Sequence, residues 1–125
     1  MSNPPQVPFS LAEWKRKPLA ERQAEFEKIK KRHPKKVAVL VGPVDERVPP
    51  LTKYKFLVDV DEKACVLPVT IRKYMTTPLR SDEGLYYFVQ NVMVPQQYPM
   101  SQLAAQYADP SGFVLVEYGR ESTFG

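Results

Sequence analysis

The chain has 125 residues, a length that suits one domain, and its 43% hydrophobic and 26% charged residues are ordinary for a soluble globular protein. No apolar run approaches the roughly 18 residues of a membrane-spanning helix, and the N-terminus lacks a signal-peptide pattern. The single cysteine excludes an internal disulfide, which fits a reducing compartment.

The net charge of +4 is unevenly distributed along the chain. Residues 1–36 contain ten Lys or Arg against four Asp or Glu, whereas residues 37–125 contain eight against ten. The basic N-terminal segment could attract nucleic acid, a tubulin-like acidic surface or anionic lipid. It could equally be the solvated face of a helix.

Two helices are predicted near the N-terminus, after an irregular proline-rich start. Ser10 followed by Glu three residues later resembles a capping box, which predicts a short helix around Leu11–Lys17. Pro18 suits the first turn of a second helix, which is expected from about Leu19 to Arg32 because its apolar residues recur at helical spacing. Pro34 ends this helix, since the residue before a proline is disfavoured in the helical conformation.

Strands and helices alternate in the rest of the chain. Runs rich in β-branched and aromatic residues predict strands at Val37–Val41, Lys55–Val60, Leu85–Val89 and Phe113–Tyr118, with a short edge strand at Asn91–Pro95. The first two strands are expected to pair antiparallel, across a loop at Asp45–Lys53.

Two further helices are predicted between these strands. One is expected at Glu62–Tyr74, with Pro68 in its first turn, and one at Gln102–Tyr107, capped by Ser101. Asp109–Gly112 reads as a turn. This order of elements predicts an α+β fold with the helices on one face of a mixed sheet.

Residues for catalysis or metal binding are sparse. His33 has no cysteine or second histidine near enough in sequence for a zinc site, and no nucleophile-elbow pattern is present. Cys65 is expected to be a small buried apolar residue rather than a nucleophile. The carboxylates of residues 59–62 lack the spacing of a calcium loop, so a solvated strand end is the better interpretation. The sequence therefore predicts a protein that is not an enzyme and holds no metal.

The chain ends in Glu121-Ser-Thr-Phe-Gly125. A terminal glycine has no side chain to obstruct an enzyme that closes around its carboxylate, so it suits activation and coupling to an amine. Many chains also end in glycine by chance, and this feature alone favours that ordinary explanation.

Several motifs, in order along the chain, resemble the GABARAP-like autophagy modifiers, a branch of the ubiquitin-like proteins. The resemblance runs from about Trp14 to Gly125 and is carried by Glu27–Pro34, Lys55–Val58, Ile71–Lys73, Phe88–Asn91, Gly112–Val116 and Glu121–Gly125. It implies a ubiquitin-like β-grasp with a mixed four-stranded sheet and two additional N-terminal helices. The corresponding parts are an N-terminal extension at 1–34, a β-grasp core at 35–119 and a C-terminal conjugation tail at 120–125.

The resemblance also implies covalent attachment to lipid through Gly125. Activating and conjugating enzymes of the autophagy pathway would carry the chain to the amine of phosphatidylethanolamine, which is a covalent lipid rather than a cofactor. A cysteine protease would process or deconjugate it. The two acyl chains would anchor it stably, so the expected locations are the cytoplasm and, after lipidation, the autophagosome membrane.

A second implied function is docking of short aromatic-x-x-aliphatic motifs of autophagy receptors, extended beside the second strand. The implied aromatic pocket comprises Glu25, Ile29, Leu40, Lys55, Leu57 and Phe113. The implied aliphatic pocket comprises Phe56, Val58, Leu67 and Thr70, with Arg72 near the acidic end of the peptide. The apolar residues among these could instead be plain core, but the resemblance favours partial exposure of Ile29, Leu40, Leu57 and Phe113 in a groove.

Four positions depart from the family pattern. Ala38 and Asp59 stand where prolines are usual, and Glu62 and Thr70 replace apolar residues of the aliphatic pocket. A more polar pocket is expected to weaken a leucine-type anchor by about 1–3 kcal/mol if the whole side chain loses its burial.

Other functions remain open from the sequence. The chain could be a peptide-binding adaptor that is never conjugated, or a modifier whose target is a protein lysine. A third hypothesis is a microtubule- or nucleic-acid-binding domain that uses the basic residues of Lys15–Lys36, including Lys30, Lys31 and Arg32.

Overall fold

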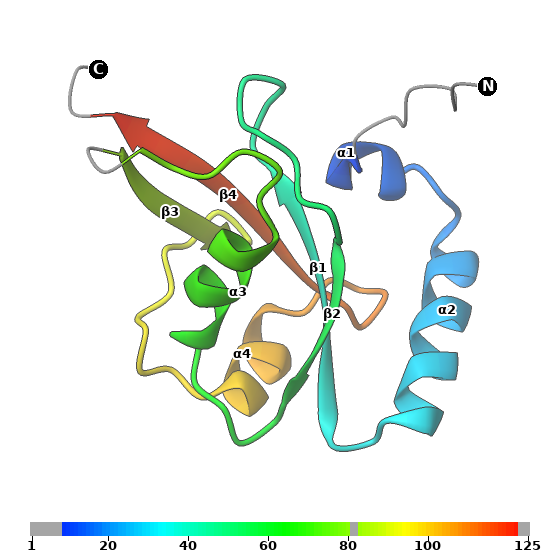
Figure 1. Cartoon of the computed structure of the whole chain (residues 1–125). Coiled ribbons are helices and arrows are strands. Elements are labelled where there is room, and N and C mark those ends of the chain that lie inside the picture. Colours follow the sequence, from blue (N-terminus) through cyan, green and yellow to red (C-terminus); the bar gives the residue numbers. More distant parts are fainter. Residues whose placement is uncertain (1–8, 81–82, 123–125) are drawn as a thin grey trace.

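A computed structural model describes residues 9–80 and 83–122 of the chain. The elements follow the predicted order of types (Figure 1) and comprise α1 (Leu11–Trp14), α2 (Leu19–Arg32), β1 (Lys36–Pro43), β2 (Lys55–Asp59), α3 (Val66–Tyr74), β3 (Glu83–Val89), α4 (Met100–Tyr107) and β4 (Val114–Ser122). The second helix has the predicted bounds. The Oγ of Ser10 accepts a hydrogen bond from the Glu13 N–H at 3.3 Å, so the predicted N-cap of the first helix is confirmed.

The four strands form one mixed sheet in the order β2-β1-β4-β3. Strand β1 pairs antiparallel with β2, as predicted, and parallel with β4, while β3 pairs antiparallel with β4. The parallel pair lies in the centre of the sheet. Strands β2 and β3 are therefore the two edges, and each has one side without a neighbouring strand.

Helices cover both faces of this sheet, so the prediction of helices on one face was wrong. Helices α1 and α2 pack on one face and α3 and α4 on the other (Figure 1). Along β1, Val39 and Val41 belong to the larger core with α3 and α4, while Ala38 and Leu40 belong to the smaller core with α1 and α2. Because both faces are covered, β1 is an almost continuous apolar run rather than an alternating one.

The predicted edge strand at Asn91–Pro95 is absent, and a tight turn follows β3 instead. Gln90 and Asn91 have positive φ angles of 52° and 64°, which is the conformation of a two-residue hairpin turn. The backbones of Val89 and Val92 exchange hydrogen bonds at 2.9 and 3.0 Å across this turn. The chain therefore reverses where the sequence suggested that it would extend.

The predicted starts of the last two helices were also wrong. Helix α3 begins at Val66 because Lys63 forms an antiparallel bridge with Pro99. The Glu62 carbonyl, which a helix from Glu62 would use, accepts the Met100 N–H at 2.8 Å instead. Helix α4 begins at Met100, with Pro99 at the cap and Ser101 already inside the first turn.

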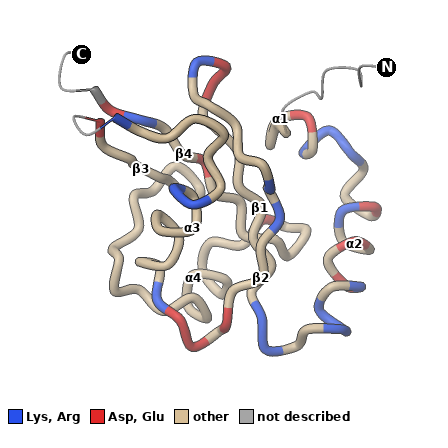
Figure 2. The backbone as a smooth tube through the Cα atoms, viewed as in Figure 1, with Lys and Arg blue, Asp and Glu red and all other residues tan. Residues whose placement is uncertain are grey.

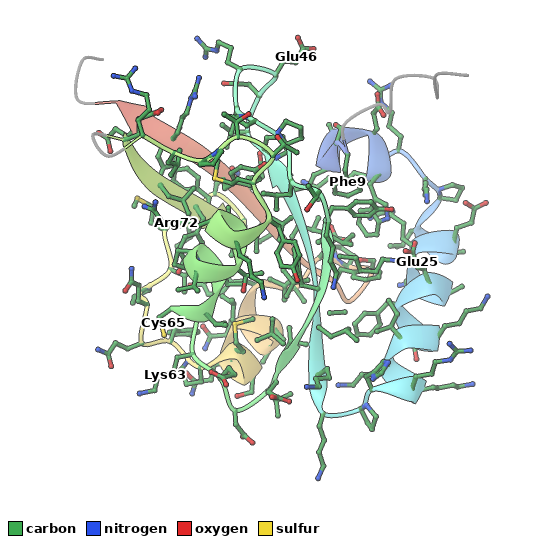
Figure 3. The ribbon with its side chains drawn as sticks, viewed as in Figure 1. Phe9, Glu25, Glu46, Lys63, Cys65 and Arg72 are labelled. Carbon is green, nitrogen blue, oxygen red and sulfur yellow. The ribbon has the colours of Figure 1, made fainter. Side chains whose placement is uncertain are left out.

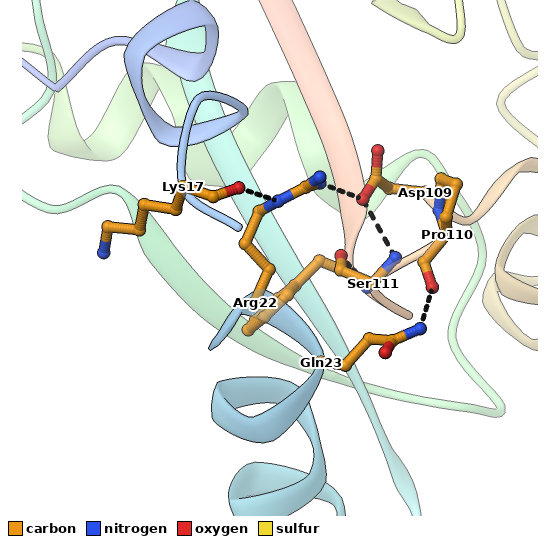
Figure 4. Close-up of polar contacts among 7 residues, drawn as sticks. Lys17, Arg22, Gln23, Asp109, Pro110 and Ser111 are labelled. Atoms are coloured by element: carbon orange, nitrogen blue, oxygen red, sulfur yellow. Dashed lines mark hydrogen bonds and ion pairs between the residues drawn. The ribbon is translucent and has the colours of Figure 1, made fainter. Parts of the chain in front are cut away.

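A partly buried polar clamp fixes α2 to the loop that precedes β4 (Figure 4). The guanidinium of Arg22 donates to the Asp109 carboxylate at 3.0 Å and, through Nε, to the Lys17 carbonyl at 3.0 Å. The same carboxylate accepts the Ser111 N–H at 3.0 Å, and Gln23 donates to the Pro110 carbonyl at 3.3 Å. This clamp sets the position of α2 relative to the sheet.

Candidate functional site

The outer edge of β2 is the first part of the candidate site. The Val41 N–H donates to the Tyr54 carbonyl at 2.8 Å and the Val60 N–H donates to the Lys35 carbonyl at 3.1 Å, one bond beyond each end of the β1–β2 ladder. In an antiparallel pair such residues alternate with residues whose N–H groups face away from the partner. The N–H groups of Lys55, Leu57 and Asp59 therefore face outward. They can donate hydrogen bonds to a strand added at this edge.

Side chains of β2 point alternately toward the two layers of helices. Phe56 and Val58 are buried in the larger core, at 6% and 8% exposed. Lys55 and Leu57 face α2 instead and remain accessible, with Leu57 38% exposed. A strand added to this edge would therefore have the α1–α2 layer on one side and α3 on the other.

A hollow of about 530 Å³ lies between α2 and β2, and is called the α2–β2 hollow below. Its apolar surface comes from Ile29 and Leu57, and its other lining residues are Lys28, Lys31, Arg32, His33 and Lys55. Basic residues gather at this end of α2 and the start of β1 (Figure 2). The arrangement suits one apolar side chain whose neighbours carry negative charge.

The residues implied for the aromatic pocket divide into two groups. Ile29, Lys55 and Leu57 line the α2–β2 hollow, and Glu25 lies beside it on the face of α2 turned toward β2 (Figure 3). Leu40 and Phe113, in contrast, are both 0% exposed. The expected partial exposure is therefore confirmed for Ile29 and Leu57, whereas for Leu40 and Phe113 it was wrong.

Phe26 explains why Phe113 is buried. Its ring packs against Phe113 at 5.5 Å between centroids and 75° between planes, and Trp14 covers the same ring at 5.3 Å and 89°. Phe26 also lies directly over Gly112, where an added Cβ would approach the ring to 2.5 Å. Phe26 and Trp14 thus fill the space between α2 and the sheet and cover Phe113.

An ion pair links α2 to the edge strand β2. The Nζ of Lys55 lies 2.6 Å from a Glu25 carboxylate oxygen. Partial burial alone raises the pKa of Glu25, but the hydrogen bond from Lys55, the charges of Lys55 and Lys17, and a hydrogen bond from Trp14 together bring this pKa below its usual value. The carboxylate is therefore ionised at neutral pH and keeps Lys55 occupied in the free protein.

The residues implied for the aliphatic pocket lie on the other side of β2. Leu67 is 2% exposed and belongs to the same core as Phe56 and Val58. Thr70 is half-buried and donates its hydroxyl hydrogen to the Val66 carbonyl at 2.8 Å, while Arg72 is exposed in the last turn of α3.

The four unusual positions have different surroundings. Ala38 is 3% exposed in the smaller core. Asp59 is exposed and pairs with the Nζ of Lys36 at 2.7 Å, and Glu62 is exposed in the loop before α3. Of the two polar replacements in the implied aliphatic pocket, Glu62 lies in solvent. The Thr70 hydroxyl donates its hydrogen bond within α3, to the Val66 carbonyl.

Comparison with known proteins identifies the family. A family model described as "Autophagy protein Atg8 ubiquitin like" matches residues 21–125. The chain belongs to the Atg8 family of ubiquitin-like autophagy proteins. Autophagy-related protein 8d of Arabidopsis thaliana is 30% identical to it over 109 residues, which cover 86% of this chain and 89% of that protein.

Two solved Atg8 structures establish the fold. Trypanosoma brucei ATG8 matches with a TM-score of 0.77 and 24% identity, covering 94% of this chain and 99% of the other. Plasmodium falciparum Atg8, solved in complex with a Plasmodium falciparum Atg3 peptide, matches with a TM-score of 0.74 and 22% identity, covering 91% and 98%. The predicted ubiquitin-like fold with a mixed four-stranded sheet and two additional N-terminal helices is confirmed.

Two sets of residues around the groove of this Atg8-family protein were missed from the sequence. Lys28, Lys31 and Arg32 line the α2–β2 hollow, and their spacing along the predicted helix already placed them on one side of it. The second set, which includes Phe9, Trp14 and Tyr54, lines a separate hollow beside α1. No pattern in the sequence links these aromatic residues, because the fold alone brings them together.

Other predicted sites have different outcomes. Cys65 is exposed rather than buried, because its neighbours Ala64 and Leu67 fill the core while its own side chain faces outward. Asp59, Asp61 and Glu62 are exposed, as expected for a solvated strand end. Within residues 9–80 and 83–122, no group of His, Cys, Asp and Glu could hold a metal ion, and no helix is long and apolar enough to cross a membrane. Gly125 lies outside the described residues.

Proposed function

We propose that this Atg8-family protein is coupled through the carboxylate of Gly125 to the amine of phosphatidylethanolamine. The observation that carries the proposal is the family match, which extends through Gly125 itself. Strand β4 carries the chain as far as Ser122, so three residues remain between the sheet and the terminal carboxylate.

The coupling needs activation because a carboxylate does not condense usefully with an amine in water. An activating enzyme would form the acyl adenylate with release of pyrophosphate, and a thioester would replace AMP. The lipid amine would then displace the thiol to form the amide. The chain supplies the acyl group and the surface that these enzymes hold. A cysteine protease that hydrolyses the amide would release it again.

The partners follow from the same proposal. Plasmodium falciparum Atg8 has been solved with an Atg3 peptide, which supports a conjugating enzyme of the autophagy pathway as a partner of this chain. Before coupling the protein would be cytoplasmic. Afterwards the two acyl chains of the lipid would hold it on the autophagosome membrane, since two chains are enough for stable anchoring.

We also propose that autophagy receptors dock on the outer edge of β2 through short aromatic-x-x-aliphatic motifs. The outward N–H groups of Lys55 and Leu57 would pair with the peptide backbone. The α2–β2 hollow would take the aromatic side chain, with Glu25, Ile29 and Lys55 around it and Leu40 and Phe113 supporting it from below. The aliphatic side chain would lie over Phe56, Val58, Leu67 and Thr70, and Arg72 would face acidic residues of the peptide.

A reconstituted coupling reaction tests the conjugation. The chain is incubated with the activating and conjugating enzymes, ATP and vesicles that contain phosphatidylethanolamine, and the lipid adduct is measured by mass spectrometry. Gly125→Ala is expected to abolish the adduct, whereas Glu121→Ala, four residues earlier, should retain it. Undiminished coupling of Gly125→Ala would contradict the proposal. An adaptor that is never conjugated would give no adduct even as the native chain.

A further inference from the structure

Strands β3 and β4 remain paired as far as Glu83 and Ser122, close to the end of the chain (Figure 1). We propose that the last residues of β4 must separate from β3 before an activating enzyme can enclose the carboxylate of Gly125. The ion pair between Glu83 and Arg120, called the latch below, holds the two strand ends together. This inference rests on the proposed coupling through Gly125 and adds a regulatory step to it.

The tail beyond the sheet is short for an enzyme that encloses its end. Three extended residues span at most about 10 Å, whereas one α-helix with its side chains is already about 10–12 Å across. A single layer of enzyme structure between the carboxylate and the sheet therefore uses the whole tail. Release of residues 120–122 from β3 extends the reach to about 20 Å, which is enough to enter a deep site.

Gly119 is the point at which β4 becomes firmly held. The Tyr86 ring lies directly over it, so that an added Cβ would collide with the ring. Tyr118, one residue earlier, is 0% exposed and donates its hydroxyl hydrogen to a carbonyl of the loop after β1 at 2.6 Å. The side chains of Arg120 and Glu121, in contrast, are exposed. Separation of the strands should therefore stop at Gly119.

The carboxylate of Glu83 ties the end of β4 to the start of β3. One of its oxygens lies 3.5 Å from Nε of Arg120, and the other accepts the Arg80 N–H at 3.2 Å. The Glu83 side chain is only 8% exposed, whereas that of Arg120 is 40% exposed. The carboxylate is therefore held in place by β3, and the guanidinium is the member of the latch that leaves when the strands separate.

The ladder adds one rung of backbone hydrogen bonds at this end. Val89 exchanges its backbone bonds with Val92 and so faces away from β4. Since the pairing of β3 with β4 is uninterrupted and residues alternate along an antiparallel pair, Gly84 faces β4 and bonds Glu121. Gly84 has no side chain to pack on its partner. The latch is thus the main side-chain contact that the described residues provide at this rung.

Loss of the latch should change the apparent affinity of an activating enzyme and not its chemistry. When only a fraction of a protein is competent to bind, the apparent dissociation constant rises as that fraction falls. A partly exposed ion pair shifts an equilibrium by roughly two- to fivefold. Weakening the latch is therefore expected to raise the separated fraction and lower KM by about this factor.

ATP–pyrophosphate exchange on the full chain measures this step, because adenylation joins the carboxylate to AMP and releases pyrophosphate. Glu83→Gln removes the charge but keeps a side-chain oxygen for the Arg80 N–H. It should lower KM for the chain roughly two- to fivefold with kcat unchanged. Hydrogen exchange of the Glu121 N–H should accelerate by a similar factor, while the amides of β1 are unaffected.

A double-mutant cycle assigns the effect to the latch. Arg120→Gln should lower KM as much as Glu83→Gln does, and the two together no further than either alone. Glu117→Gln is the matched control, since it removes one carboxylate of β4 before Gly119 and should keep the native KM. Additive effects of the two latch variants would show that each residue acts separately, and would overturn the inference.

A reversible crosslink tests whether separation is required. Gly84→Cys and Glu121→Cys, combined with Cys65→Ser, place thiols on directly opposed residues, whose Cα atoms are about 5.5 Å apart in such a pair and within the range of a disulfide. The oxidised protein, freed of oxidant, should give no pyrophosphate exchange, and reduction should restore it.

Three outcomes would overturn the latch: native exchange by the oxidised protein, an unchanged KM of Glu83→Gln, or an unchanged hydrogen exchange of Glu121 in that variant. Should the reduced crosslinking variant be inactive, the KM of Glu83→Gln decides. Absence of exchange with the native chain and an active enzyme would instead overturn the proposed coupling itself, and the inference with it.

Discussion

The ion pair between Lys55 and Glu25, at 2.6 Å, joins the edge strand to α2 across the middle of the groove. In the free protein the carboxylate of Glu25 occupies the position that an acidic residue of a receptor peptide would need in order to reach Lys55. Such a peptide would have to share the Lys55 ammonium group with Glu25 or displace Glu25 from it. If a receptor peptide docks as proposed, the pair would compete with its acidic residues, and its energy is modest because both side chains are partly exposed.

Removing this competitor is expected to strengthen binding. For Glu25→Gln, an aromatic-x-x-aliphatic peptide with an acidic flank should bind about two- to fivefold more tightly, the range that corresponds to a partly exposed ion pair. Fluorescence anisotropy at low and high salt measures the effect, which should shrink as salt screens the charges. Glu27→Gln removes an exposed carboxylate of the same helix and controls for net charge. Weaker binding of the peptide to Glu25→Gln than to Glu27→Gln would show that Glu25 assists the ligand rather than competing with it.

The same ion pair predicts how stability depends on pH. The pKa of Glu25 is lower in the folded protein than its ordinary value of 4.5, so ionised Glu25 stabilises the fold above that value, and this contribution disappears as pH falls through the folded pKa. The difference in free energy of unfolding between the native chain and Glu25→Gln should therefore be constant near neutral pH and decrease below about pH 4.5. Urea denaturation at a series of pH values measures it. A difference that grows on acidification would contradict the assignment.

A second prediction concerns the clamp on α2. Arg22 and Asp109 are 87 residues apart in the sequence, and their side chains are only 13% and 9% exposed. Removal of one member leaves a buried charge without its partner, so Asp109→Ala should lower the free energy of unfolding by about 3 kcal/mol. Urea denaturation checks this value.

Asp59→Ala is the matched control for the clamp. It breaks an ion pair with Lys36 in which the side chains are 37% and 56% exposed, and should cost at most about 1 kcal/mol. Equal effects of the two substitutions would show that the clamp is no stronger than a surface pair. If the clamp positions α2, Asp109→Ala should also weaken peptide binding under conditions where the variant remains folded.

The fold was largely predictable because its signals are local. Pro18 and the His33-Pro34 pair fixed the ends of α2, and the apolar run at Val37–Val41 identified the central strand. The faces that the helices cover were not predictable, since both faces of β1 are apolar and the run does not alternate. The turn at Gln90 and Asn91 was missed because it needs two residues with positive φ, which the flanking apolar residues did not indicate.

The candidate site was predictable where a single strand determines it. Alternation along β2 separates Lys55 and Leu57 from Phe56 and Val58, and this can be read from the sequence. The burial of Phe113 could not be predicted from the sequence. It depends on Phe26 and Trp14, which only tertiary packing brings to it. The hollow beside α1 was missed for the same reason, since Phe9 and Tyr54 meet only in the folded chain.

The direction of the N–H groups along β2 provides the sharpest test of strand addition. Proline is tolerated in an edge strand where the lost N–H faces solvent and is costly where that N–H bonds the neighbouring strand. Val58→Pro removes a donor that faces β1 and should unfold much of the sheet, whereas Leu57→Pro removes an outward donor and should leave a cooperatively folded protein. Comparison of the two by urea denaturation checks the hydrogen-bonding pattern before any ligand is added.

Peptide binding then separates the two contributions of Leu57. Leu57→Ala removes the side chain from the α2–β2 hollow but keeps the outward N–H, so it measures the loss of apolar contact. Leu57→Pro also loses the donor, and one hydrogen bond contributes about 0.5–1.5 kcal/mol, so its Kd should be a further two- to tenfold weaker than that of Leu57→Ala. Equal affinities of these two variants would mean that the peptide uses the hollow without pairing its backbone to β2.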